Sequence, residues 1–176
     1  MLTEHLDGLF RTALRLCEGH DADAEDLLQD TVLRAFTSYW QLREPSAARS
    51  WLFTILSRTH LNRVRSRRRR AEMVSADLDE TAFEAALADW TPVHSPADKV
   101  ETRQLGEQLT QALNQLPPEL RAIVVLVDVE GFTQREVAGM HGVPEGTVAS
   151  RLFRARRHLR TALEAPARDA RLWRHQ

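Results

Sequence analysis

Apolar residues recur at intervals of three and four along most of the chain, which is the spacing of one face of an α-helix. From Ala24 to Trp40 the apolar positions with this spacing are Leu28, Val32, Ala35, Phe36 and Tyr39. Asp21 or Asp23 stands where an N-cap is expected. Pro45 interrupts the pattern, and a second helix is predicted to start between Ser46 and Ser50 and to run to residue 70. Strand-type alternation bounded by hairpin turn residues is absent from the sequence, so we predict an all-α fold.

A second helical block is predicted from Glu101 onward. Its first helix has the apolar positions Leu105, Leu109, Leu113 and Leu116, and Pro117 and Pro118 end it. The next has Leu120, Ile123, Val124 and Val127 and ends near Gly131. Residues 71–100 carry two prolines and a poor apolar period, with room for a short helix around Ala82 to Trp90. We therefore predict two small helical domains, 1–70 and 101–165, a flexible linker at 71–100 and a tail at 166–176.

The end of the second block has the pattern of a helix-turn-helix. Thr133 and Glu136 fit a capping box for a short helix that ends near Met140. Gly142 fits a tight turn, and Pro144 fits the first turn of a final helix. A short helix, a three-residue turn and a longer helix together indicate DNA binding in the major groove.

The final helix is predicted to have a core face and a DNA-reading face. On a helical wheel the core positions are Val148, Leu152, Ala155, Leu159 and Leu163. The opposite side and its flanks carry Ala149, Ser150, Arg151, Phe153, Arg154, Arg156, Arg157 and Arg160. Small residues let the helix approach a groove, and arginines contact phosphates or guanine edges. The alternative is a bundle helix with a charged, solvated outer face.

A second polar stripe lies on the helix that follows Pro45. Trp51, Arg58, Asn62 and Arg65 share a narrow arc of this helix. An aromatic ring, an amide and guanidinium groups can stack on and hydrogen-bond to unpaired bases, and Arg67 to Arg70 can follow the DNA backbone. The alternative for Trp51 is a large core residue at the start of its helix.

The net charge of −1 conceals separate charge zones. Residues 58–70 hold seven arginines and no acid, and residues 145–176 hold eight arginines against three acids. Residues 72–101 between them hold eight acids and one lysine. Two basic zones around an acidic connector suit a polyanion that is contacted at two places.

Cysteine and histidine usage argues against a metalloprotein. The single Cys17 excludes an internal disulfide and a thiolate zinc site, and the seven histidines lack metal-ligand spacing. We expect no cofactor. The start MLTEHLDGLF carries acids where a signal peptide needs basic residues, and the sequence has no apolar run long enough to span a bilayer. We expect a cytoplasmic protein.

Three segments together resemble the sigma-70 family of bacterial transcription initiation factors, and among them the short extracytoplasmic-function (ECF) members. DAEDLLQDTVLRAF resembles the region 2 helix that binds the clamp helices of RNA polymerase, and WLFTILSRTHLN resembles the strand-opening segment. The stretch from Leu116 to Arg160 resembles region 4. The phrases ILSRTHLNRVR and DVEGFTQREVA are most similar to the subgroup that answers thiol-oxidative stress and is held by a zinc-binding anti-sigma factor.

The resemblance implies roles for individual residues. Core RNA polymerase would be bound by Asp26, Gln29, Asp30, Leu116, Leu120, Ile123 and Val124. The −10 promoter element would be melted and read by Trp51, Arg58, Asn62, Arg65, Arg67 and Arg68, with a flipped base held by the loop from Pro45 to Ser50. The −35 element would be read by Ala149, Ser150, Arg151, Phe153, Arg154, Arg156 and Arg157. The chain has Arg58 where many members have asparagine, and Asn62 where aspartate is common.

Two other classes of protein compete with this interpretation. One is a dimeric helix-turn-helix regulator that acts on duplex DNA without polymerase. The other is a metal-dependent nuclease that uses carboxylates such as Asp26 and Asp30, but the sequence offers no second ligand set. We therefore expect a protein that is not an enzyme, with polymerase supplying the catalysis.

Overall fold

The computed structural model describes residues 2–42, 44–74 and 103–172, and within these ranges it contains helices and no strand. The first block comprises α1 (Leu2–Leu16), α2 (Asp21–Thr37), the short 3-10 turns η1 (Tyr39–Gln41) and η2 (Pro45–Ala47), and α3 (Ala48–Val74). The second block comprises α5 (Arg103–Gln115), α6 (Pro118–Val124), η3 (Val125–Val129), α7 (Gln134–His141) and α8 (Glu145–Leu172). The predicted all-α fold is confirmed.

Helix α1 was not predicted, although its apolar pattern is present. Leu9, Ala13 and Leu16 recur at helical spacing and are 0–1% exposed. A left-handed turn at Glu18 (φ 61°) and Gly19 (φ 82°) joins α1 to α2. The predicted N-cap of α2 is wrong: His20 occupies it without a side-chain hydrogen bond, and Asp21 and Asp23 lie in the first turn. In the first turn their carboxylates interact favourably with the positive end of the helix dipole.

Other element boundaries differ from the sequence prediction in small ways. Helix α3 runs to Val74, past the end predicted at residue 70, and α8 runs to Leu172, past the predicted domain boundary at residue 165. The chain after α6 continues as the π-helical turn η3 before Glu130 ends it. The short helix predicted around Ala82 to Trp90, and most of the predicted linker, lie outside the described residues.

The helix-turn-helix is formed as predicted. Thr133 Oγ1 accepts a hydrogen bond from Glu136 N, and Glu136 Oε2 accepts one from Thr133 N, so the capping box is present. Gly142 ends α7 with φ 68°, a left-handed conformation that glycine adopts without steric cost. The apolar faces of α6, α7 and α8 then meet in a shared core.

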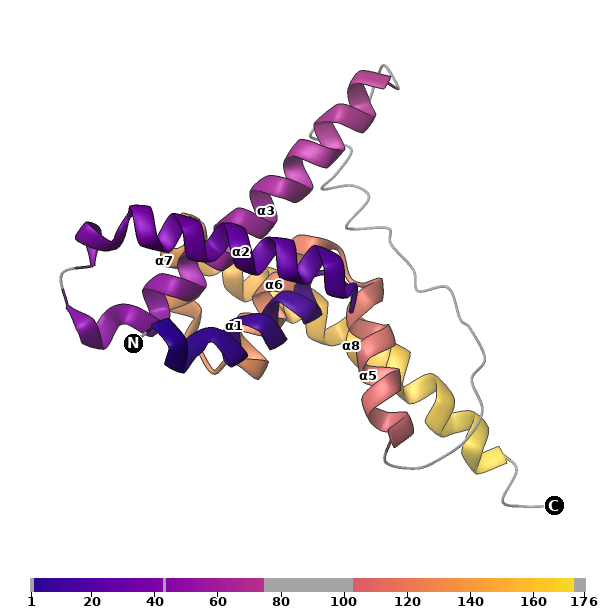
Figure 1. Cartoon of the computed structure of the whole chain (residues 1–176). Coiled ribbons are helices and arrows are strands. Elements are labelled where there is room, and N and C mark those ends of the chain that lie inside the picture. Colours follow the sequence, from indigo (N-terminus) through magenta and orange to yellow (C-terminus); the bar gives the residue numbers. More distant parts are fainter. Residues whose placement is uncertain (1, 43, 75–102, 173–176) are drawn as a thin grey trace.

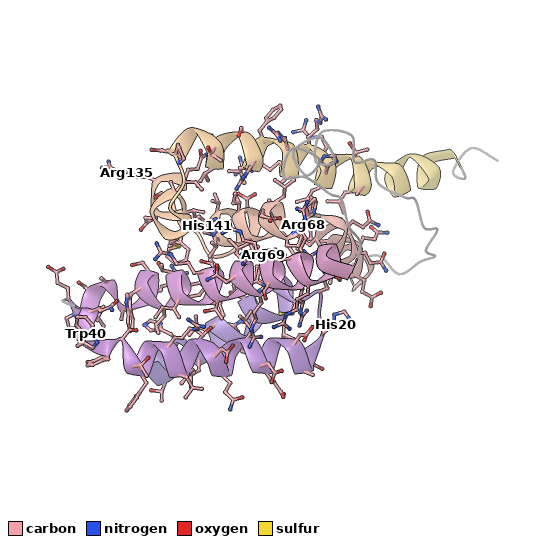
Figure 2. All side chains as sticks on the ribbon, turned by 90° about the horizontal axis from the view of Figure 1, so that it is seen from above. His20, Trp40, Arg68, Arg69, Arg135 and His141 are labelled. Carbon is pink, nitrogen blue, oxygen red and sulfur yellow. The ribbon has the colours of Figure 1, made fainter. Side chains whose placement is uncertain are left out.

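The two blocks pack against each other rather than standing apart. Helix α3 contacts α6 and α7, and α1 contacts α5, α6 and η3. Figure 2 shows α3 between the α1–α2 layer and the helices of the second block. The end of α3 projects upward from the rest of the ribbon, and α5 and α8 run side by side below it, on the same side of the view (Figure 1). One face of α3 is therefore covered by the second block.

Candidate nucleic-acid interface

Helix α8 presents an open face of the predicted composition. Val148, Leu152 and Ala155 are 0–1% exposed and form the core side. On the other side Ala149, Ser150 and Arg157 are exposed, and Phe153 is 70% exposed. Arg151 and Arg154 lie half-buried at the edges. The structure brings the predicted −35 residues together on one surface.

Arg156, also on α8, is held by an acid from η3. Its Nε donates to Asp128 Oδ2 at 3.1 Å and its Nη2 to Asp128 Oδ1 at 2.5 Å. This hydrogen bonding raises the pKa of Arg156. A bidentate pair fixes the plane of the guanidinium while leaving other N–H groups for a phosphate.

The stripe on α3 is only partly open. Asn62 and Arg65 are exposed, but Trp51 is half-buried and packs against the core. Arg58 Nε donates to the carbonyl of Met140 at 2.7 Å, and its Nη2 to the carbonyl of Gly139 at 3.3 Å. The carbonyls at the end of α7 therefore bind Arg58, the central arginine of the predicted −10 surface.

The basic end of α3 also pairs with α2. Arg67 donates to Asp23 Oδ1 at 3.1 Å, a hydrogen bond that lowers the pKa of Asp23. Arg63 donates to Asp30 Oδ2 and to the carbonyl of Asp26. Arg68, which the sequence assigned to DNA, is half-buried. These contacts fix α2 against α3.

The outer face of α2 and the following turn η1 carry exposed apolar side chains, of which Phe36 and Tyr39 belong to the apolar face predicted from the sequence. Buried positions of this helix are Ala24, Leu27, Thr31 and Ala35. Phe36 is 81% exposed, and Leu33, Tyr39 and Trp40 are 57–79% exposed. Trp40 lies at the periphery of the first block (Figure 2). Leu33 and Phe36 follow exposed Asp26 and Gln29 along α2, and Tyr39 and Trp40 follow in η1, so a mixed polar and apolar surface is available for a protein partner.

The apolar residues of the second block that were assigned to polymerase binding are buried, unlike those of α2. Leu116, Leu120, Ile123 and Val124 are all 0–3% exposed. In this conformation they form core, and a docking role for them stays a prediction.

Glu130 is a junction between the blocks that the sequence did not reveal. Thr12 Oγ1 donates to its Oε1 at 2.6 Å, and Arg49 Nη2 donates to its backbone carbonyl at 2.7 Å and to Oε2 at 3.4 Å. Arg15 lies 3.9 Å from the same carboxylate. The Arg49 guanidinium also stacks 4.3 Å from the centre of the Phe132 ring. In the sequence, the segment 130–132 indicated only the end of a helix near Gly131.

Arg121 is a second junction, and its side chain is 2% exposed. It donates across the blocks to the carbonyl of Leu16 at 3.0 Å and to Glu18 Oε1 at 2.9 Å. Within the second block its acceptors are the carbonyls of Leu113, Asn114 and Leu116, each at 2.9 Å. A buried guanidinium is tolerated because each of its three nitrogens donates to at least one acceptor.

Two histidines are shielded from solvent: His60 is buried and His141 is half-buried. Burial, followed by the charge of Arg121, lowers the pKa of His60 to about 4. Burial, followed by the charge of Arg151, lowers the pKa of His141 to about 4. His141 lies at the end of α7, on the side toward α3 (Figure 2). Both histidines are neutral at pH 7, and neither Nε2 has a hydrogen-bond partner.

A cleft of about 230 Å³, lined by both polar and apolar side chains, lies beside His60, between Arg63 and Arg67 of α3 and Pro118 of α6. It also contains Cys17, whose pKa is raised to about 11 by burial and then by Asp23. That thiol is protonated at neutral pH and is a weak nucleophile. Among the described residues no cluster of histidine, cysteine and carboxylate groups could hold a metal ion.

Comparison with known proteins defines the class. The sequence matches "Sigma-70 region 2" over residues 1–70 and "Sigma-70, region 4" over residues 106–159. It is 38% identical to the ECF RNA polymerase sigma factor SigE of Mycolicibacterium smegmatis over 93% of this chain, but it spans only 60% of that relative. It is 36% identical to the ECF RNA polymerase sigma factor SigL of Mycobacterium tuberculosis, with 92% of this chain and 85% of SigL covered.

The fold is also that of a solved sigma factor. The structure of RpoE from Bartonella quintana, in complex with the anti-sigma factor NepR, is similar with a TM-score of 0.67 and 27% identity. The similarity covers 93% of this chain and 94% of RpoE. The chain belongs to the sigma-70 family, as one of its ECF sigma factors.

Within the described residues no helix is both long and apolar enough to cross a membrane.

Proposed function

We propose that this chain binds core RNA polymerase and directs it to specific promoters, with an anti-sigma factor controlling its release. The observation that carries the proposal is the open face of α8, where small residues precede arginines behind a correctly capped helix-turn-helix. This geometry suits the major groove of a −35 element. The chain itself needs no catalytic group, because polymerase performs the chemistry in the cytoplasm.

The other contacts follow from the two remaining surfaces. The outer face of α2, with Asp26, Gln29 and exposed Phe36, supports polymerase binding. The α3 stripe with Trp51, Arg58 and Asn62 supports contact with the −10 element after the blocks separate. Arg58 must first leave the carbonyls of Gly139 and Met140.

Control by an anti-sigma factor is supported by the packed arrangement of the blocks. RpoE has a similar fold over nearly its whole length, and its structure contains NepR. An inhibitor that favours the packed form of this chain would keep Arg58 away from DNA. Membership of the thiol-oxidative-stress subgroup, and zinc binding by the partner, stay predictions.

The test is run-off transcription with purified core polymerase and a library of upstream regions from the source genome. Discrete start sites that require this chain would support the proposal and would give both promoter elements. The alternative, a dimeric regulator, predicts no new transcripts and sequence-specific duplex binding by a dimer. Sedimentation of the chain alone and with polymerase separates the two outcomes.

A further inference from the structure

The cleft beside His60 has walls from both blocks. Most of its lining belongs to α2, α3 and the turn between α1 and α2, and the second block contributes Pro118 and Arg121 of α6. Its volume of about 230 Å³ is below the range of about 300–1,000 Å³ that holds drug-sized ligands. A ligand in this cleft would therefore be small and would contact both blocks.

Positive charge predominates in the cleft. The lining contains the arginines Arg63, Arg67 and Arg121 against the carboxylates of Glu18 and Asp23. The same three arginines act on the histidine of the cleft, since burial and then the charges of Arg121, Arg67 and Arg63 lower the pKa of His60 to about 4. An electrostatic environment that disfavours a protonated imidazole favours an anion.

Two of the arginines have donors to spare. Among the described residues Arg67 donates only through Nη2, to Asp23 Oδ1 at 3.1 Å. Arg63 also donates only through Nη2 there, to Asp30 Oδ2 and to the carbonyl of Asp26. The Nε and Nη1 groups of both side chains remain for a ligand, and the guanidinium fork matches the geometry of a carboxylate.

His60 adds a buried polar atom without a partner. The residue is 6% exposed and lines the cleft, and its Nε2 has no hydrogen-bond partner within the described part of the chain. An unpaired buried polar atom costs free energy, so a ligand that supplies the missing partner gains affinity.

The rest of the lining is apolar. Leu27 of α2, Val64 of α3 and Pro118 of α6 line the cleft together with the thiol-bearing Cys17. The Cys17 thiol is protonated at neutral pH, because burial and then Asp23 raise its pKa to about 11. An anionic head with a short apolar body matches this combination of arginines, imidazole and aliphatic groups.

We propose that the cleft binds a small carboxylate with a short apolar chain, and that the bound ligand stabilises the packed arrangement of the two blocks. The carboxylate pairs with Arg63 and Arg67 and accepts a hydrogen bond from His60, while the chain lies against the aliphatic groups. Because the walls come from both blocks, the ligand binds the packed form and favours it by mass action.

A regulatory consequence rests on the proposed function. If the blocks must separate before Arg58 can leave the carbonyls of Gly139 and Met140, a ligand of the packed form inhibits transcription initiation. Binding itself does not depend on that function and is tested without polymerase or DNA.

The single cysteine of the chain is a reporter in the cleft. The full chain is labelled with N-ethylmaleimide, and intact-mass spectrometry gives the rate at which Cys17 reacts. Sodium pentanoate is the probe. Sodium chloride controls for ionic strength, pentanamide has the same shape without the charge, and sodium phosphate has the charge without the apolar chain.

A ligand of this size should have a Kd of about 2 mM. About 10 mM pentanoate should then slow the labelling of Cys17 by about fivefold and raise the melting temperature by about 2–4 °C. The three comparison solutes should slow labelling by less than about twofold.

Variants of α3 locate the binding. Arg67→Gln leaves two arginines against two carboxylates in the cleft, and His60→Leu removes the ring nitrogens, so each should reduce the protection to less than about twofold. Arg69→Gln is the matched control, because it removes the same charge from an exposed position of α3 outside the cleft, and it should keep the protection of about fivefold. Thermal unfolding without ligand shows that each variant is folded before it is labelled.

Three results would overturn the proposal. The first is that pentanoate slows labelling no more than sodium chloride does. The second is that pentanamide or phosphate protects Cys17 as well as pentanoate, which would make charge or shape alone responsible. The third is that Arg67→Gln or His60→Leu is protected as well as Arg69→Gln. A failure of the proposed function would appear instead in run-off transcription and would leave these labelling rates unchanged.

Discussion

Helices α3 and α8 both carry an arginine stripe, but the two stripes differ in how far the rest of the fold covers them. On α8 the predicted reading face is open, with Phe153 70% exposed and Ala149 and Ser150 at the surface. On α3 the second block covers one side and binds Arg49 and Arg58 through its oxygen atoms. A helical wheel identifies a polar stripe, but only tertiary packing decides whether it faces solvent. If the two stripes bind DNA as proposed, we expect the packed chain to contact duplex DNA through α8 before single strands through α3.

The strongest way to break this contrast is to remove Arg121. Arg121→Met removes the guanidinium that donates to the buried carbonyls of Leu16, Leu113 and Leu116, so the free energy of unfolding should fall by about 3–5 kcal/mol. Urea unfolding at pH 7.5 measures the loss. Arg135→Met on the exposed surface of α7 is the control (Figure 2), with an expected change below about 0.5 kcal/mol. Equal effects of the two variants would contradict the assigned role of Arg121.

The second-largest effect is expected from low pH, which should weaken the packing of the two blocks. The pKa values of His60 and His141 are lowered to about 4, so an unfolded chain with ordinary histidines takes up protons that the folded chain refuses. The contribution of each neutral histidine to the free energy of unfolding is fully present above pH 6.5. It is lost as the pH falls toward 4, by about 2–3 kcal/mol for each histidine.

Urea unfolding of the wild type and of the double variant His60→Asn, His141→Asn measures this effect. The comparison between pH 7 and pH 4.5 subtracts the carboxylates, which protonate in both proteins. A double variant that loses as much stability as the wild type would refute the role of the histidines.

The open stripe on α8 can be tested by itself. Arg154→Ala should reduce discrimination between a specific and an unrelated duplex by about 1–3 kcal/mol if Arg154 reads a base. Arg160→Ala, further along α8, should weaken both duplexes alike. Electrophoretic mobility shifts with a promoter from the run-off experiment measure both. Unchanged discrimination in Arg154→Ala would remove Arg154 from the reading face.

The smallest effect is expected at the start of α7, the helix whose end binds Arg58. Thr133→Ala removes the capping hydroxyl and should cost about 1 kcal/mol of stability. Thr161→Ala is the control, because its hydroxyl bonds only within α8 among the described residues. A shift in melting temperature measures both, and a larger shift for Thr161→Ala would argue against the cap.

Local features of the second block could be predicted from sequence because they depend on neighbouring residues. The capping box at Thr133 and the left-handed Gly142 follow from side-chain and backbone chemistry within a few positions. The buried face of α8 follows from its period. Family resemblance then supplied the roles proposed for the reading face.

Features that depend on distant residues could not be predicted in the same way. The helical periodicity of the sequence predicts that Phe36 shares the apolar face of α2 with the buried Ala35, but packing leaves Phe36 81% exposed. Glu130 and Arg121 look like ordinary charged residues of helix ends, and their partners in the first block are more than 80 positions away. Nothing in a local pattern specifies which block a charged side chain will meet.

The arginines that join the two blocks end largely on main-chain oxygens. Arg49, Arg58 and Arg121 all cross to peptide carbonyls, those of Glu130, Met140 and Leu16. A peptide carbonyl survives nearly every substitution of its own residue, so the accepting side of the contact is insensitive to mutation while the donating side is not. Sequence drift can therefore change the side chains around these carbonyls without uncoupling the blocks, whereas the loss of one arginine removes its link in a single step.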